Sequence, residues 1–181
     1  MLKRDVTDLK MVEAPFDRIS YKKAIELLQS KRFMIIEEDG SKHSIKWGDD
    51  LNIDSERELT KNATKPIFVV GYPIEVKPFY VKEDCSSMGL GLAADMLAPK
   101  GFGEITSGGL REDNIALLTK RIEKEGLNPT TYEWYLDLRK YGSVPHGGFG
   151  LGIERLIRWI TNVVDIKDTV LFPRTISRVT P

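Results

Sequence analysis

Apolar residues recur at helical spacing in four segments of the chain, and this pattern predicts four main helices. The first spans residues 21–31 behind the capping residue Ser20, and the second spans residues 111–125. Thr130 caps a third helix that ends near residue 140, and the fourth covers residues 153–160. The side chains expected to face the core lie three or four positions apart: Ala24, Ile25 and Leu28 in the first helix, Ile115, Leu118 and Ile122 in the second, and Ile153, Leu156, Ile157 and Ile160 in the last.

Shorter apolar or alternating runs between these segments predict strands. Two such runs over residues 33–47 flank Asp39 and Gly40, a pair typical of a hairpin turn. The acidic residues that follow Trp47 predict a loop leading into a short helix, and residues 66–73 form a nearly all-apolar strand. Further strands are expected over residues 78–82, 89–97, 102–106 and 147–152.

The strands cluster before and between the helices instead of alternating regularly with them. This order predicts an α+β fold in which helices flank a mainly antiparallel sheet. Residues 1–16 are charged and mixed, so we expect an N-terminal arm that docks through Met11, Val12 and Phe16. The 181 residues suit one domain, and residues 17–181 are expected to form it.

The composition is that of an ordinary globular protein, with 41% apolar and 30% charged residues. Lys and Arg together number 27, as do Asp and Glu, so the chain lacks the overall basic charge of proteins that bind nucleic acid mainly through counterion release. Cys85 is the single cysteine, which excludes an intrachain disulfide. No apolar run approaches the roughly 20 residues of a membrane helix, and the start lacks the apolar core of a signal peptide, so we expect no membrane partner and a cytoplasmic location.

A glycine-rich stretch before the last predicted helix is the first candidate for chemistry. Gly148, Gly150 and Gly152 alternate, so in a strand they lie on one face and leave a flat floor for a planar ring such as adenine. Arg155 follows at the junction with the helix, where its guanidinium suits a phosphate. A glycine strand packed on another backbone, with Arg155 in a surface ion pair, is the competing interpretation of this spacing.

A second candidate lies around the predicted strand over residues 102–106. In a regular strand Glu104 and Thr106 share one face and Ser107 takes the other, but a bulge at Gly108–Gly109 would bring Ser107 round. The oxygens of Glu104 and Ser107 are of the type that Mg²⁺ accepts together with phosphates and water. Arg111 can donate to a carboxylate or amide oxygen. The alternative is an edge strand with a solvated Glu104 and a helix that starts at Arg111.

Lys77 is the third candidate. It stands between apolar residues and before Pro78, which can place its ammonium group over a pocket. A solvated strand residue is the alternative. His43 and His146 lie too far apart in the sequence to suggest a zinc site, and His146 is expected at the rim of a pocket.

These segments, in this order, resemble the class II aminoacyl-tRNA synthetases of the aspartate, asparagine and lysine subgroup. Residues 147–155 are similar to motif 3 of that class, including its final Glu154–Arg155. Residues 104–112 resemble the subgroup's Glu-Ile-x-Ser-Gly-Gly-x-Arg-Glu strand and helix start. The similarity to the asparaginyl members covers nearly the whole chain from about residue 3, including residues 72–80.

The resemblance implies a ligase that uses ATP and Mg²⁺ to activate asparagine or aspartate, with tRNA as a further partner. It also implies a role for each candidate: Arg155 binds the γ-phosphate, Gly148, Gly150 and Gly152 form the adenine floor, Glu104 and Ser107 hold Mg²⁺ with Asp95 nearby, and Arg111, Lys77 and Ser107 serve the amino-acid pocket. Residues 99–101 lengthen the turn between Asp95 and Glu104, which separates Asp95 from the pattern of the subgroup.

The chain departs from the family in what it lacks. The anticodon-binding barrel, motif 1 and motif 2 of the family are absent from the 181 residues, so we expect a partial catalytic domain. Motif 2 supplies the arginine on the ATP α-phosphate, and the loss of one such donor commonly costs about 3–4 kcal/mol. An active ligase would need a substitute from Arg4, Lys3 or a partner chain. The alternative function is a catalytically inactive paralogue that binds nucleotide or amino acid, or serves as a partner subunit.

The missing strands have a second consequence. A partial sheet would expose an edge or an apolar face that the full domain covers. We therefore expect self-association as a homodimer, or pairing with another chain that covers the sheet.

Overall fold

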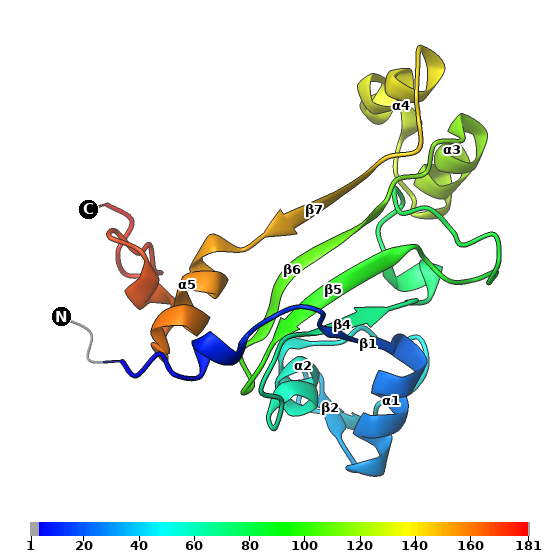
Figure 1. Ribbon diagram of the computed structural model, residues 1–181. Coiled ribbons are helices and arrows are strands. Elements are labelled where there is room, and N and C mark those ends of the chain that lie inside the picture. Colours follow the sequence, from blue (N-terminus) through cyan, green and yellow to red (C-terminus); the bar gives the residue numbers. More distant parts are fainter. Residues whose placement is uncertain (1–3, 181) are drawn as a thin grey trace.

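A computed structural model describes residues 4–180, and its centre is a five-stranded sheet in the order β1-β4-β5-β6-β7 (Figure 1). The strands are β1 (Asp17–Ser20), β4 (Ile67–Val70), β5 (Ala93–Ala98), β6 (Gly103–Leu110) and β7 (Gly147–Leu151). Only β1 and β4 run parallel, whereas the other three neighbouring pairs are antiparallel. The predicted α+β fold with a mainly antiparallel sheet is confirmed.

Helices and a small hairpin surround this sheet. The α-helices are α1 (Tyr21–Ser30), α2 (Ile53–Thr60), α3 (Ile115–Lys124), α4 (Glu133–Lys140) and α5 (Ile153–Thr161). Short 3-10 helices are η1 (Leu9–Met11), η2 (Ile74–Val76), η3 (Pro129–Tyr132) and η4 (Ile166–Thr169), and the hairpin consists of β2 (Met34–Ile36) and β3 (Lys42–Ser44). Helices α4 and α5 lie at opposite ends of β7 (Figure 1). Between residues 4 and 180, none of the helices has the length and apolar character needed to cross a membrane.

Side-chain caps set where several helices begin. The predicted cap of α1 is confirmed, because the Ser20 hydroxyl accepts a hydrogen bond from the Lys23 amide at 3.1 Å. Asn114 caps α3, which starts four residues later than predicted because Arg111 still forms an isolated bridge with Val81. Asn128, not Thr130, accepts the capping bond at the start of η3, and α4 follows directly.

The strand predicted over residues 78–82 is wrong. The segment turns instead, and only Val81 forms an isolated bridge, with Arg111. Its backbone groups bond to different elements in turn: the Tyr80 carbonyl accepts from the Glu112 amide and the Lys82 carbonyl from the Leu92 amide. Arg121 on α3 donates to the carbonyls of Val81 and, in the turn before this segment, of Lys77 and Ile74, at 2.7, 2.9 and 3.1 Å. The position of Lys77 is therefore fixed by α3.

The N-terminal arm docks on the sheet, but not wholly as predicted. Val12 packs on the cluster around Trp159, and the Phe16 ring centroid lies 6.5 Å from that of Phe68. Met11 is 66% exposed and contradicts the prediction, because the short helix η1 turns Leu9 toward the cluster in its place. The division between an arm over residues 1–16 and a domain over residues 17–181 stays a prediction.

The core forms mainly where α1 and the hairpin cover the sheet. The predicted α1 face is buried there with Tyr21, Val69, Tyr72 and Leu97. In α3, Leu118 and Ile122 are buried, but Ile115 is 39% exposed at the first turn.

The apolar face predicted for α5 is wrong at two positions. Ile153 and Ile160 are 55% and 43% exposed, whereas Trp159 is buried against Ala98 and Ile105. Helix α5 covers only one end of the sheet, so a narrow stripe of the helix meets the core.

Candidate functional site

A β-bulge in β6 brings the two oxygen-bearing candidates to one face of the sheet. Asp95 pairs with Ser107 and Leu97 pairs with Glu104, with a register shift between Met96 and Leu97. Strand β6 therefore carries one extra residue, Ile105, whose side chain is buried on the opposite face. The expected bulge exists, but at Ile105 and not at Gly108–Gly109.

The bulge opens onto a cavity of about 550 Å³ that collects most of the predicted site residues. The sequence candidates that line it are Lys77, Asp95, Glu104, Ser107, Arg111 and Gly150. Glu56, Tyr80 and Asp50 also line it and were not among the candidates. Segments far apart in the chain thus meet at one site.

The three alternating glycines make room for different groups. A side chain at Gly148 would lie 3.1 Å from Arg111 Nη2, and one at Gly152 would lie 3.1 Å from Arg155 Cδ. Above Gly150, no heavy atom of the described chain lies within 4 Å of where a Cβ would stand. Gly150 therefore offers the open floor, while the other two glycines let the arginines approach the backbone.

A buried ion pair holds the bottom of the cavity. Lys77 Nζ lies 2.6 Å from Asp95 Oδ2, and the Ser107 hydroxyl donates to Asp95 Oδ1 at 2.5 Å. Lys77 also lies 3.7 Å from the centroid of the Tyr72 ring. Burial, with the charge of Asp95 next in size, raises the pKa of Tyr72 far above its ordinary value. Lys77 is thus a buried, paired residue and not a solvated one, and both oxygens of Asp95 are engaged.

Arg155 links α5 to the bulge. Its Nη1 donates to the Glu104 carboxylate at 2.9 Å and to the Glu104 carbonyl at 3.1 Å. Burial raises the pKa of the Glu104 carboxyl, with Asp95 adding to the effect and Arg155 opposing it. Arg155 itself is 49% exposed, so its guanidinium stays accessible to a ligand.

A second cavity of about 610 Å³ is lined by Arg155 and shares Leu51, Glu56 and Glu104 with the first. Arg57 and Arg158 also line it, so three guanidinium groups surround one space. Burial lowers the pKa of Arg158, and the neighbouring charges of Arg57 and Arg155 lower it further. Glu56, Glu104 and Asp165 line the same cavity and balance part of this positive charge. Each guanidinium can still donate to an anionic group such as a phosphate.

Arg111 occupies the other side of the first cavity. Its guanidinium carbon lies 4.5 Å from the centroid of the Tyr80 ring, and its amide donates to the carbonyl of His146. The stacking fixes the guanidinium in position next to Gly148. His146, just before β7, is exposed, and its place at the rim of a pocket stays a prediction.

Glu56 is the functional candidate that the sequence did not reveal. From α2, its Oε2 accepts a hydrogen bond from the Glu104 amide at 2.9 Å. Burial raises its pKa to about 7, and the Glu104 charge also raises it. Glu56 stands among the acidic residues after Trp47 and far from Glu104 along the chain, so no local pattern marks it.

We expect the substitution Glu56→Gln to flatten the pH dependence of thermal stability between about pH 5 and 8. In the folded chain the pKa of Glu56 is about 7, above its ordinary 4.5, so the folded state binds this proton more tightly than the unfolded state. The stability that the protonated Glu56 side chain contributes is fully present below pH 4.5 and is lost as the pH rises through 7. Melting curves at several pH values measure the effect.

Glu58→Gln is the matched control on the same helix. Its bond to Lys31 lowers the pKa of Glu58, so this carboxyl is ionised throughout the tested range. The control should shift the melting temperature equally at each pH. An unchanged pH profile in Glu56→Gln would contradict the prediction.

Comparison with known proteins places this chain in a family. The family model for class II tRNA synthetases (D, K and N) matches residues 1–176. Asparagine–tRNA ligase of Pyrococcus abyssi is 54% identical over 181 residues, which are 100% of this chain and 39% of that protein. The corresponding protein of Desulforamulus reducens is 41% identical, again over 100% of this chain and 40% of its own length.

Solved structures that resemble this chain belong to the same family. Asparaginyl-tRNA synthetase from Pyrococcus horikoshii, complexed with asparaginyl-adenylate, superposes with a TM-score of 0.89 at 50% identity. The superposed region covers 99% of this chain and 39% of the Pyrococcus horikoshii chain. Aspartyl-tRNA synthetase from Entamoeba histolytica superposes with a TM-score of 0.80 at 28% identity, over 94% of this chain and 34% of the Entamoeba chain. The chain spans about 39% of the length of the relatives from Pyrococcus. It belongs to the class II tRNA synthetases of the D, K and N type, and within them it is asparaginyl-tRNA synthetase-like.

Proposed function

We propose that this chain binds ATP, Mg²⁺ and asparagine, and that the bound groups serve ATP-dependent activation of the amino acid. The observation that carries the proposal is the bulge at Ile105, which turns Glu104 and Ser107 into one cavity with Arg111. A relative of 50% identity is known in complex with asparaginyl-adenylate, the product of such an activation.

The residues present fit a magnesium ion that is shared with phosphates. Mg²⁺ is usually held by one or two carboxylates together with phosphate oxygens and water. Glu104 supplies a carboxylate and Ser107 a hydroxyl on the same face. From residue 4 to residue 180, no three His, Cys, Asp or Glu side chains gather as a metal site, so the proposed ion relies on the nucleotide for most of its ligands.

We propose that the two ends of the bound substrates lie in the two cavities. Adenine would lie over Gly150, where the floor is open, and the γ-phosphate would bind Arg155 beside Arg57 and Arg158. Bound Mg²⁺ would offset phosphate charge. Arg111 would donate to the side-chain oxygen of the amino acid, while Lys77, already neutralised by Asp95, shapes that pocket.

Arg4 is held outside the two cavities. Its Nη2 lies 3.2 Å from Asp8 and its Nε donates to the carbonyl of Ile160, at the end of α5 and away from the residues that line the two cavities. Arg4 therefore does not replace the motif 2 arginine, and Lys3 lies outside the described residues. The second function that we propose is a chain that binds nucleotide or amino acid without activating it, or that completes its site with a partner.

An exchange assay separates the two functions. ATP–pyrophosphate exchange is measured with asparagine and with aspartate, alongside calorimetry with ATP and Mg²⁺. Exchange with asparagine supports amino-acid activation, and binding without exchange supports the inactive subunit. Absence of nucleotide binding overturns both, and exchange with aspartate alone overturns the choice of asparagine.

Partners and location follow as further proposals. We propose tRNA as a partner on the strength of the family, and a cytoplasmic location. Because Lys plus Arg equals Asp plus Glu at 27 each, any tRNA contact depends on a local basic surface or on another domain.

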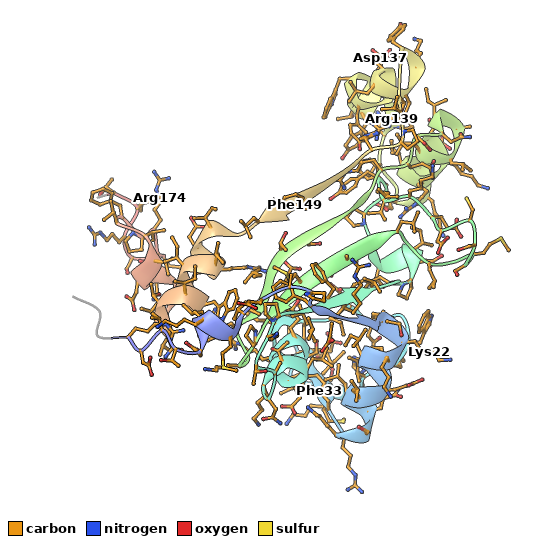
Figure 2. The ribbon with its side chains drawn as sticks, viewed as in Figure 1. Lys22, Phe33, Asp137, Arg139, Phe149 and Arg174 are labelled. Atoms are coloured by element: carbon orange, nitrogen blue, oxygen red, sulfur yellow. The ribbon has the colours of Figure 1, made fainter. Side chains whose placement is uncertain are left out.

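We also propose that a second copy of this chain covers the sheet face opposite Glu104. A cavity of about 1030 Å³ opens there, lined mainly by apolar side chains that include Phe68, Met96, Leu110 and Phe149. Figure 2 shows Phe149 on β7, which is the edge strand of the sheet, and its side chain is 77% exposed. An apolar face beside an open strand edge is suited to pairing with the same surface of another copy.

We expect light scattering at micromolar concentration to show a dimer, and Phe149→Glu to shift it toward the monomer. A charge on this face would have to be buried without a partner in the dimer, which weakens association by about 10-fold or more. Leu171→Glu is the control, since Leu171 is 90% exposed and does not line this cavity. A monomeric wild-type chain would contradict the proposal.

A further inference from the structure

We propose that Glu56 is a positioning residue for the metal and nucleotide site: its carboxylate holds the β6 bulge that directs Glu104 into the cavity. The inference rests on the proposed binding of ATP and Mg²⁺ and adds a residue outside motif 3 and β6. The following contacts carry it.

Helix α2 presents the Glu56 side chain from a fixed base. The Asn52 side chain caps the helix by accepting from the Ser55 amide at 2.9 Å, and the Ser55 side chain is buried. One turn beyond, the buried Thr60 hydroxyl donates to the Glu56 carbonyl at 2.8 Å. The backbone of Glu56 is therefore anchored on both sides.

The Glu56 carboxylate satisfies a backbone group next to the bulge. A bulge interrupts the hydrogen-bond ladder between two strands and leaves an amide without its usual partner. Here the Glu104 amide donates to Glu56 Oε2 at 2.9 Å. Gly103 has a φ of +78°, and a Cβ there would stand 3.0 Å from the same oxygen, so glycine permits this close approach.

The register of β6 determines where Glu104 points. Strand residues alternate between faces, so one residue more or less moves a side chain to the other side of the sheet. With Ile105 as the extra residue, Glu104 reaches Arg155 Nη1 at 2.9 Å and lines both cavities. If the Glu104 amide has no acceptor, the bulge is no longer held in place, and the Glu104 side chain is no longer held toward the cavity.

Two substitutions distinguish the role of the oxygen acceptor from bulk and charge. Glu56→Gln keeps an oxygen that can accept from the Glu104 amide, whereas Glu56→Ala removes it. Calorimetry with ATP at increasing Mg²⁺ concentration should show the Mg²⁺ requirement raised about 10-fold in Glu56→Ala and within about threefold of wild type in Glu56→Gln. Affinity for ATP without Mg²⁺ should change less than about twofold in either variant.

Hydrogen exchange followed by NMR tests the contact directly. The Glu104 amide should exchange slowly in wild type and in Glu56→Gln, and at least about 10-fold faster in Glu56→Ala. Glu58→Ala on the same helix is the control, because Glu58 pairs with Lys31 and lines neither cavity.

Each outcome decides a different claim. A Glu56→Ala variant that melts lower but keeps the wild-type Mg²⁺ requirement has lost only stability, and this overturns the inference. An equal rise in the Mg²⁺ requirement for Glu56→Gln and Glu56→Ala also overturns it, because charge and not the acceptor would then matter. A wild-type chain that binds no ATP with Mg²⁺ overturns the proposed function itself.

Discussion

The substitution Arg155→Ala is expected to weaken ATP binding by about 100-fold. Hydrogen bonds to charged groups contribute about 1.5–3 kcal/mol each, and a loss of about 2.7 kcal/mol corresponds to 100-fold. Arg155 is half exposed and faces the cavity that also holds Arg57 and Arg158. Calorimetry with ATP and Mg²⁺ measures the loss directly.

Two comparisons make this result specific to the γ-phosphate. AMP lacks that phosphate, so its affinity should change less than about threefold in Arg155→Ala. Arg18→Ala is the protein control, because Arg18 is an exposed arginine on β1, at the far edge of the sheet. Equal losses for ATP and AMP, or an unchanged ATP affinity, would show that Arg155 does not bind the γ-phosphate.

Much of the fold could be predicted because its signals are local. The Ser20 cap and the apolar face behind it define α1, and the Asp39–Gly40 pair defines the hairpin. The segment around Lys77 could not be predicted in the same way. Its apolar residues suggest a strand, but Arg121, which donates to the carbonyls of Lys77 and Val81, lies 44 and 40 residues later in the chain.

The candidate site, like the fold, could be predicted only where its signals are local. The residue types and the order of Glu104, Ser107, Arg111 and Arg155 predict a site, and the structure places these residues along two cavities that share Glu104. The position of the bulge does not follow from the spacing, because an extra residue at Ile105 or at the glycines would give the same sequence pattern. It depends on the burial of Ile105 on the opposite face and, as we propose, on Glu56, both long-range effects.

The cations of the first cavity also differ in a way that only the structure shows. Lys77 is buried and neutralised by Asp95, whereas Arg111 is held by stacking on Tyr80. As we propose, Arg111 meets the substrate and the Lys77–Asp95 pair supports the pocket. The pair is therefore expected to matter most for stability.

We expect Asp95→Ala to lower the free energy of unfolding by about 3–5 kcal/mol, the usual cost of leaving one member of a buried ion pair without its partner. Lys77 and Asp95 side chains are only 11% and 6% exposed, so water cannot replace the lost carboxylate. Ser107 loses its hydrogen-bond acceptor at the same time. Urea unfolding followed by circular dichroism measures the change.

The double variant Lys77→Met with Asp95→Ala separates the lost partner from the lost side chain. If the penalty comes from the unpaired ammonium, removing that charge restores much of the stability, because an apolar replacement of a buried pair is often neutral. Asp113→Ala is the matched control, since its pair with Lys82 at 2.5 Å is more exposed, at 24% and 27%, and should cost clearly less stability than Asp95→Ala. Equal losses for Asp95→Ala and Asp113→Ala would show that burial does not set the value of these pairs. A double variant no more stable than Asp95→Ala would place the cost in the lost Asp95 contacts, among them the bond from Ser107, and not in the unpaired Lys77.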